Sequence, residues 1–335
     1  MRIAKPTLAL LAASLVASLA TSLGIGAFGT TALGAEAGPW PQRTVRLIVP
    51  FGSGTSNDTT ARHFAERLGK RWGQPVVIEN QPGADTMKGV GVFASTQDDH
   101  TLLFTGSASL TVVPLMTDRL PYNPRRDFVP ISTACITTIV IAAAASSNIS
   151  SLADLVSDAR AEPGKLMWTS GPSLPNFLFE GFLKSLALDM LYVPYKETTP
   201  QLTDLSQGRI HILVTGLVAT LPLYKAGKAR LLAVTNNERA ASFPEIPTVK
   251  DAGQPIMSVD GLSGFFGRRD MPTELRDWIA AEIRAVAVDP QLRSRLESIG
   301  QILHVGTPAE FEAQIEAQRS WATQLAKLVN SKSMQ

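Results

Sequence analysis

One loop of this sequence combines residue types that could bind an anion. It runs from Val49 to Arg62 with the sequence VPFGSGTSNDTTAR. The β-branched run Val45–Val49 predicts a buried strand, and apolar residues at helical spacing after the loop predict a helix with Ser56 as its N-cap. A helix N-terminus offers unpaired N–H groups and the positive end of the helix dipole, which suit a carboxylate or phosphate. A plain strand-to-helix turn would explain the same loop, and that alternative stays open.

The other reactive residue types form no catalytic or metal-binding pattern. The sequence has no GxSxG motif, and Cys135 lies between apolar neighbours, which predicts a buried thiol rather than a reactive one. The histidines lack the spacing of a metal site or a triad. They are His63, His100, His211 and His304. We therefore expect no catalytic residues and no metal site.

The N-terminal segment resembles an export signal. Arg2 and Lys5 form a positive start, Leu8–Leu23 is rich in apolar and small residues, and Ala35–Ala37 fits a cleavage site. No cysteine comes directly after the apolar run, so a lipid anchor is not expected. No twin arginine is present, so export in the folded state is not expected either. We predict a signal peptide over residues 1–37 and a periplasmic protein. An uncleaved membrane anchor is the alternative.

Composition narrows the possible functions of the mature chain. Removing the signal leaves about 300 residues, enough for two domains or one large one. Hydrophobic residues make up 44% of the chain and charged residues 18%, as in a globular protein. The net charge of +2 is mixed along the sequence without a basic stripe. Nucleic acid is therefore not an expected partner.

Strand and helix patterns alternate in two cycles, which predicts an α/β fold of two lobes. The apolar runs Thr138–Ala145 and Val259–Phe266 are expected to cross between them. The predicted lobes are residues 38–138 with 256–335, and residues 139–255. Thr307–Glu310 is a capping box, and the C-terminal helices are expected to pack on the first lobe. A cleft between the lobes would be walled by strand ends and helix N-termini.

Eight blocks are spread along nearly the whole mature chain, namely WPQRTVRLIVPF (40–51), GQPVVIENQPGA (73–84), LPYNPRRDFVP (120–130), PGKL (163–166), VPYK (193–196), LTDL (202–205), KAGKARLLAVT (225–235) and FPEIPTV (243–249). In this order they resemble the periplasmic solute-binding proteins of tripartite tricarboxylate transporters, the TctC or Bug family. The resemblance implies a type II venus-flytrap fold in which each lobe has a mostly parallel sheet of strand order 2-1-3-n-4. It also implies a monomer without cofactor or enzymatic activity, which delivers a small organic carboxylate to membrane permease subunits.

The resemblance also implies where a ligand binds. The family grips a carboxylate with the loops after its first two strands, and a third loop here matches Ser170–Ser173. Thr215 stands where the family often has an acid after the third strand of its second lobe. The residues assigned to ligand binding are Gly52, Ser53, Gly54, Thr55, Ser56, Asn57, Asp58, Gly83, Ala84, Asp85, Thr86, Ser170, Gly171, Ser173 and Thr215.

Several of these positions depart from the family pattern. Thr55 and Ser56 replace glycines of the first loop, and Leu262-Ser263-Gly264 replaces a Trp-Tyr-Gly motif. Asp85 lies where the family backbone approaches a carboxylate. Its side chain could cap the second helix, repel an acidic ligand, or accept an ammonium or hydroxyl group.

Two rival functions remain, an exported α/β enzyme and a ligand sensor without a transporter. Gly52-x-Gly54 after a strand, with Glu79 ending the next strand, is part of a dinucleotide fingerprint. Asn57 stands where the dinucleotide-binding fingerprint has its third glycine. An exported protein would also meet little nicotinamide cofactor. We therefore expect no cofactor.

Overall fold

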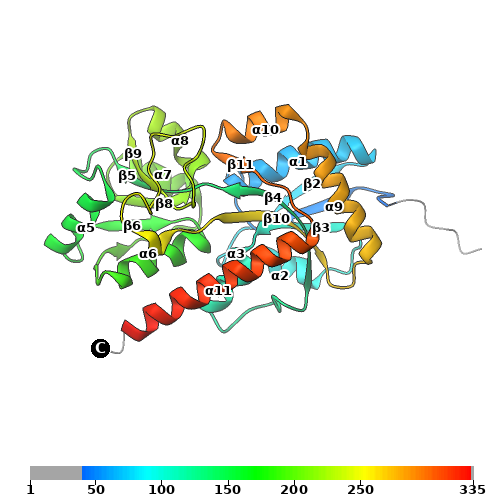
Figure 1. Ribbon diagram of the computed structural model, residues 1–335, viewed down its shortest axis with the longest axis horizontal. Helices are drawn as coiled ribbons and strands as arrows, with labels where there is room; N and C mark the ends of the chain where they lie inside the picture. Colours follow the sequence, from blue (N-terminus) through cyan, green and yellow to red (C-terminus); the bar gives the residue numbers. More distant parts are fainter. Residues whose placement is uncertain (1–39, 333–335) are drawn as a thin grey trace, which may run out of the picture. The chain divides into compact units, whose positions relative to one another are not determined.

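Residues 40–332 are described by the computed structural model of the protein, with side chains up to residue 327 (Figure 1). The predicted signal peptide over residues 1–37 lies outside this range. The described residues lie within one compact unit. Within the described range, no helix has the length and apolar character needed to cross a bilayer.

The first of two mixed sheets has six strands. Its parallel strands β1, β2 and β3 are the first three strands of the described chain. Leu47 of β1 lies opposite Ile78 of β2 and Leu102 of β3. β10 runs antiparallel between β3 and β4. The spatial order is β11 (Gln301–Leu303), β4 (Phe128–Thr137), β10 (Gly261–Arg268), β3 (Thr101–Gly106), β1 (Val45–Val49) and β2 (Val76–Asn80).

Helices cover both faces of this sheet because successive side chains of a strand point to opposite sides. Leu47 and Val49 pack toward α1, α9 and α10, whereas Ile48 packs with α2 and the start of α11. The helices that follow strands of this sheet are α1 (Ser56–Trp72), α2 (Met87–Ser95), α3 (Ala108–Thr111), α4 (Val113–Met116), α9 (Thr273–Ala287), α10 (Pro290–Glu297) and α11 (Pro308–Lys332).

The second sheet has five strands and the same plan. β5 enters directly after β4 and runs antiparallel between β8 and β9, while β6, β7 and β8 are parallel. The spatial order is β7 (Leu191–Tyr192), β6 (Met167–Ser170), β8 (Ile212–Gly216), β5 (Ile139–Ala144) and β9 (Ala229–Val234). Its helices are α5 (Leu152–Ala161), α6 (Leu174–Ser185), α7 (Thr198–Ser206), α8 (Leu217–Lys225) and the 3₁₀ turn η1 (Pro255–Met257).

Both sheets have the predicted strand order 2-1-3-n-4, where n is the antiparallel strand that enters from the other sheet. The short edge strand β11 is an addition that the sequence patterns did not indicate. We call the six-stranded sheet with its helices the first lobe and the five-stranded sheet with its helices the second lobe. The residue boundaries given for these lobes above stay a prediction.

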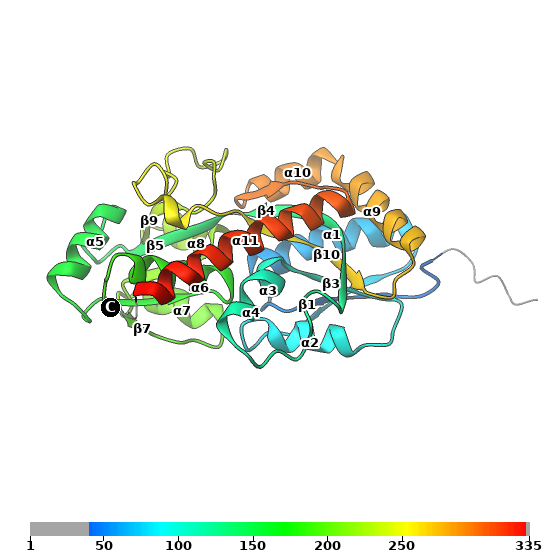
Figure 2. The ribbon, with the colours of Figure 1, turned by 60° about the horizontal axis from the view of Figure 1, so that its bottom comes forward.

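Helix α11 differs from the expected packing. The predicted capping box is present, since Thr307 N–H donates to Glu310 Oε2 at 2.7 Å and Glu310 N–H donates to Thr307 Oγ1 at 3.2 Å. Phe311 then packs on the first lobe, but Trp321 meets Phe177 of α6 at a ring-centroid distance of 6.3 Å. The helix therefore joins both lobes instead of covering the first alone (Figures 1 and 2).

Candidate functional site

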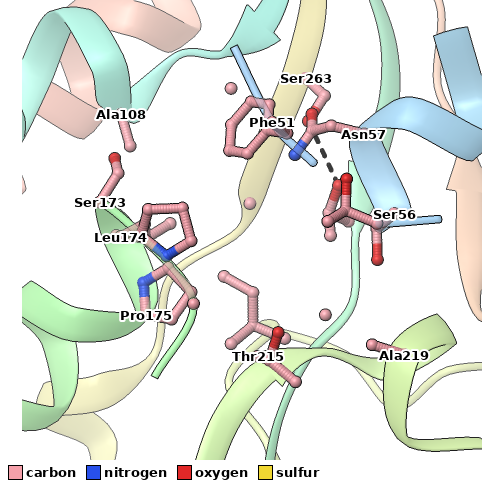
Figure 3. Close-up of a pocket in the computed structure, with 18 of the residues that line it drawn as sticks. Phe51, Ser56, Asn57, Ala108, Ser173, Leu174, Pro175, Thr215, Ala219 and Ser263 are labelled. Carbon is pink, nitrogen blue, oxygen red and sulfur yellow. Dashed lines mark hydrogen bonds between the residues drawn. The ribbon is translucent and has the colours of Figure 1, made fainter. Parts of the chain in front are cut away.

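A cavity of about 80 Å³ lies where strand ends of both sheets meet the starts of α1, α6 and α8. Figure 3 shows Ser56 and Asn57 on one side of it, Ser173 and Leu174 on the other, and Thr215 below. This is the edge at which open α/β sheets bind ligands. The lining residues are Phe51, Thr55, Ser56, Asn57, Gly106, Ala108, Thr137, Ile139, Gly171, Pro172, Ser173, Leu174, Pro175, Thr198, Thr215, Gly216, Ala219, Gly261, Leu262 and Ser263.

The start of α1 presents unpaired polar groups to this cavity. Thr55, not Ser56, is the N-cap, because Thr55 Oγ1 accepts a hydrogen bond from Asp58 N–H. Ser56 becomes the first helical residue; its side chain is 5% exposed, and its Oγ has no hydrogen-bond partner. Among the described residues, the N–H groups of Ser56 and Asn57 also have no acceptor. These donors remain available at the positive end of a 17-residue helix.

Asp58 faces away from the cavity and fixes the shape of the loop. Its buried carboxylate accepts hydrogen bonds from Gly54 N–H at 2.8 Å and Asn80 Nδ2 at 2.9 Å, and pairs with Arg62 at 2.9 Å. Burial raises the pKa of Asp58, but the hydrogen bonds from Arg62, Asn80 and Gly54 outweigh it and hold the pKa below its usual value. The carboxylate is thus an internal anion at this helix start.

The start of α6 is built differently. Ser173 is 3% exposed, and its Oγ has no partner. Its backbone has φ 65° and ψ −114°, a conformation that residues other than glycine rarely adopt. Ser173 N–H donates to Asp85 Oδ1 of the first lobe at 3.4 Å, and Pro172 and Pro175 have no N–H to offer. A residue of the other lobe therefore occupies a donor of this helix start.

The loop that carries Asp85 is held in left-handed conformations. Ala84, Asp85 and Thr86 have φ of 48°, 50° and 77°, and Thr86 Oγ1 donates to Ser109 Oγ at 2.9 Å. Thr86 is the N-cap residue of α2, and no side chain makes a capping hydrogen bond there. The interpretation of Asp85 as a cap for the second helix is therefore wrong.

The structure brings part of the predicted ligand-binding set to one cavity. Thr55, Ser56 and Asn57 line it from the first lobe, and Gly171, Ser173 and Thr215 line it from the second. Their role in binding stays a prediction. The predicted residues outside the lining are Gly52, Ser53, Gly54, Asp58, Gly83, Ala84, Asp85, Thr86 and Ser170.

Sequence reasoning missed the apolar part of the lining. Phe51 precedes the first loop, Ala108 begins α3, and Ile139 and Leu262 belong to the two strands that pass between the lobes. Leu262 stands out in the sequence only as part of the segment that replaces the family's Trp-Tyr-Gly motif, and the other residues give no signal beyond their position next to predicted strand ends. Their convergence depends on how the two sheets pack, which a sequence pattern does not specify.

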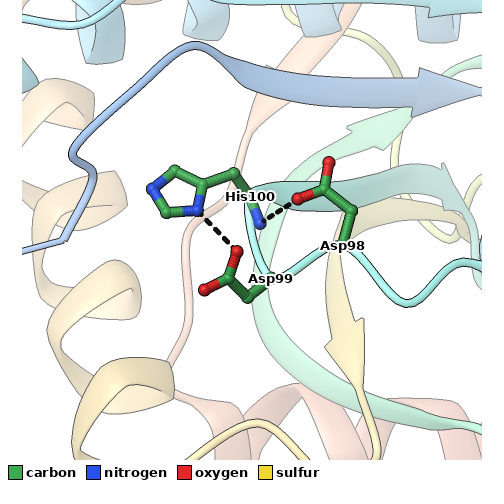
Figure 4. A group of neighbouring side chains, drawn as sticks. All are labelled: Asp98, Asp99 and His100. Carbon is green, nitrogen blue, oxygen red and sulfur yellow. Dashed lines mark hydrogen bonds and ion pairs between the residues drawn. The ribbon is translucent and has the colours of Figure 1, made fainter. Parts of the chain in front are cut away.

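A second group of side chains, Asp98, Asp99 and His100, has the composition of a metal site (Figure 4). Its atoms are already engaged, because Arg43 Nη2 bonds to Asp98 Oδ1 at 2.6 Å and Asp99 Oδ1 at 2.9 Å. Gln42 N–H donates to His100 Nε2 at 3.1 Å, so Nδ1 carries the proton that bonds to Asp99. The arginine supplies the positive charge, which favours a structural role. Cys135 is buried as predicted, and burial raises its pKa to about 12.

Comparison with known proteins identifies the family. Residues 60–311 match the tripartite tricarboxylate transporter family receptor, TctC. The chain belongs to this family. A UPF0065 protein of Bordetella bronchiseptica is 31% identical over 299 residues, which are 89% of each chain. The family predicted from the sequence blocks is therefore confirmed.

Solved structures agree with the fold of this TctC protein. One, described as a periplasmic transporter, has a TM-score of 0.82 at 28% identity and covers 86% of this chain and 98% of its own. R. palustris Rpa4515, solved with adipate, has a TM-score of 0.82 at 29% identity and covers 87% of this chain and 99% of its own. The α/β periplasmic-binding-protein fold predicted from the sequence is confirmed.

Proposed function

We propose that this TctC protein is a periplasmic solute-binding protein that captures a small organic carboxylate in the cavity and delivers it to a permease of the tripartite tricarboxylate type. The observation that carries the proposal is the start of α1, where two N–H groups and the buried Ser56 Oγ face the cavity without partners. Family membership and the adipate bound to Rpa4515 support the choice of a carboxylate.

The physical basis is anion binding by dipoles instead of by a cation. N–H groups at a helix start and hydroxyl groups stabilise a carboxylate without burying an unpaired lysine or arginine. Ser56 comes from the first lobe and Ser173 from the second, so closure of the two lobes would desolvate a ligand held between them. Opening of the lobes would release it to the permease. Export by the signal peptide over residues 1–37 is part of this proposal.

The lining favours binding over catalysis. Among the described residues, those that line the cavity include no His, Asp, Glu, Lys or Cys, and neither Ser56 Oγ nor Ser173 Oγ is hydrogen-bonded to a base, since Asp85 bonds to Ser173 through the backbone N–H. An activated hydroxyl nucleophile needs such a base within hydrogen-bond reach. An exported enzyme acting at this cavity would therefore need its base from elsewhere. A bound solute is instead expected to leave chemically unchanged.

Mass spectrometry of the ligand that copurifies with the protein tests the proposal, and an organic carboxylate is the expected result. Calorimetry with that ligand should show Ser56→Ala/Ser173→Ala to bind more weakly by about 1 to 3 kcal/mol, the range for stranding a buried polar partner. Asn57→Pro should also weaken binding, because it deletes an N–H donor while fitting the first turn of a helix.

Two matched controls accompany these variants. Asn57→Ala keeps the N–H that Asn57→Pro removes, and Ser157→Ala removes an exposed hydroxyl on α5. Unchanged affinity in both the double Ala variant and Asn57→Pro would contradict the proposal that N–H groups and hydroxyls at the helix starts bind the carboxylate. A copurified ligand without a carboxylate, or one converted to a product, would contradict the function itself.

A further inference from the structure

The cavity has no charged wall. Its lining side chains are hydroxyls, one amide, apolar groups and glycines, and no ionisable residue is among the described residues that line it. A charge on a ligand can then be compensated by N–H dipoles, hydroxyl groups and the Asn57 amide. The place where an anionic group binds therefore depends on a cluster of free N–H groups and on any charge of the protein beside it.

One such cluster is present at the start of α1. Ser56 and Asn57 contribute N–H groups without an acceptor, and Ser56 contributes a buried Oγ without a partner. Gly54 N–H is excluded, because it already donates to Asp58 Oδ2 at 2.8 Å. The remaining donors match the two oxygens of one carboxylate.

The opposite wall differs by a negative charge of the protein, although among the described residues Leu174 N–H, Asn176 N–H and the buried Ser173 Oγ have no partner there. Ser173 N–H donates to the carboxylate of Asp85, and the flanking Pro172 and Pro175 have no N–H. Burial raises the pKa of the nearby Tyr192, and the negative charge of Asp85 raises it further. A ligand carboxylate at this wall would meet an occupied donor and a like charge.

The position of Asp85 is built into the backbone. Ala84, Asp85 and Thr86 all have positive φ, and so does Ser173, the residue that Asp85 contacts. Such backbone is unfavourable for most residues other than glycine and persists only where its surroundings impose it. Four of the five non-glycine residues with positive φ in the described chain thus lie in this one contact, the fifth being Ala187.

Apolar side chains provide the remaining contact surface. Phe51, Ala108, Ile139, Leu174, Pro175 and Leu262 line the cavity between the two helix starts. These groups contribute binding free energy in proportion to the apolar ligand surface that they remove from water. The body of the ligand is therefore better matched by carbon than by charge.

We propose that the cavity selects a molecule with one carboxylate and an uncharged, mostly apolar body, and that Asp85 rejects a second carboxylate. The inference rests on the proposed carboxylate-binding function and specifies its substrate class. Asp85 acts as a specificity-determining residue at the α6 wall. The single ligand carboxylate binds at the α1 wall.

Calorimetry of the mature chain with matched acids tests this inference. The probes are hexanoate with adipate, and benzoate with terephthalate, which differ within each pair by one carboxylate. In at least one pair the monocarboxylate should bind at least tenfold more tightly than its partner. Asp85→Asn should reduce that ratio by about tenfold through tighter dicarboxylate binding, since it removes the like charge and tolerates positive φ.

Asp189→Asn is the matched control, because it removes an exposed carboxylate just before β7, at the opposite end of that strand from the cavity. It should leave the ratio unchanged. If the dicarboxylate binds wild type as tightly as its partner in every pair that binds, the inference is overturned and the proposed function stands. An unchanged ratio in Asp85→Asn would overturn the role of Asp85. Binding of no probe acid would overturn the carboxylate function as well.

Discussion

The starts of α1 and α6 face one another across the same cavity, and each has a buried serine hydroxyl without a partner, but they differ in backbone conformation and in capping. Thr55 caps α1 through its side chain with extended backbone, whereas Ser173 precedes α6 in a strained conformation without a side-chain cap. Both N-cap N–H groups are used, since that of Thr55 donates to Gly52 O at 3.4 Å and that of Ser173 donates to Asp85 Oδ1 at 3.4 Å. The two similar lobes therefore place at one cavity a relaxed helix start and a strained one that is held by a carboxylate of the other lobe.

This difference shows how two lobes of the same topology can divide one binding task. A helix start supports anion binding only where its N–H groups are not already used by the protein. At α1 the internal anion, Asp58, bonds to Gly54 and leaves the next donors free. At α6 the internal anion, Asp85, comes from the other lobe and takes the N–H of the N-cap residue Ser173.

The largest expected effect comes from crowding the α1 side. A Cβ at Gly216 would clash with Ser56 Oγ and lie 3.1 Å from Ser56 Cβ, across the boundary between the lobes. Gly216→Val should therefore prevent full closure and weaken binding of the copurified ligand by about 1 to 3 kcal/mol, as measured by calorimetry.

Two variants sharpen this result. Gly216→Val combined with Ser56→Gly should recover part of the affinity, because the clashing side chain is gone. Gly171→Ala crowds the α6 side only mildly, with a Cβ 3.2 Å from Thr215 Oγ1, and should have a small effect. Equal losses at Gly216 and Gly171 would show that the two helix starts are not distinguished by closure.

The second prediction concerns the stability of the two helix starts. Ser173→Gly should raise the free energy of unfolding by about 1 kcal/mol, because glycine adopts φ 65° without strain and is accepted at an N-cap position. Thr55→Ala should lower it by about 1 kcal/mol through loss of the side-chain cap. Urea denaturation measures both. A loss of stability in Ser173→Gly would mean that its backbone is not strained.

Local sequence features predicted the α1 side well. The β-branched run before Gly52 predicted the strand, and the helical spacing of apolar residues after Ser56 predicted the helix. Both patterns are visible in the sequence because each element buries apolar side chains. The cap was misplaced by one residue, since Thr55 and Ser56 are both good N-caps and only the backbone geometry decides between them. The strand order followed from the family resemblance.

The α6 side could not be predicted in the same way. The contact of Asp85 with Ser173 joins residues 88 positions apart and depends on left-handed backbone that neither residue type requires. Strand β11 has only three residues, too few to show a period. The 25-residue α11 joins the lobes because Trp321 in its later turns contacts Phe177, and the sequence of α11 alone does not predict that contact.

The smallest effect concerns pH and the internal anion of α1. The pKa of Asp58 is lowered in the folded protein, so its ionised form contributes stability above the unfolded pKa of about 4, and this contribution is lost as pH falls through the folded pKa. Asp58→Asn should lower the free energy of unfolding by about 1 kcal/mol at pH 7, because Gly54, Asn80 and Arg62 lose their charged acceptor.

Below about pH 4 the difference between wild type and Asp58→Asn should shrink, since protonation makes the wild-type side chain resemble the amide. Urea denaturation of both proteins at pH 7, 5 and 3.5 gives this difference and cancels the titration of the other carboxyl groups. Asn57→Ala, which changes no ionisable group, should differ from wild type by a similar amount at each pH. A difference between wild type and Asp58→Asn that stays constant down to pH 3.5 would show that the charge of Asp58 does not hold the α1 loop. The free donors of Ser56 and Asn57 would then owe their position to Thr55 alone.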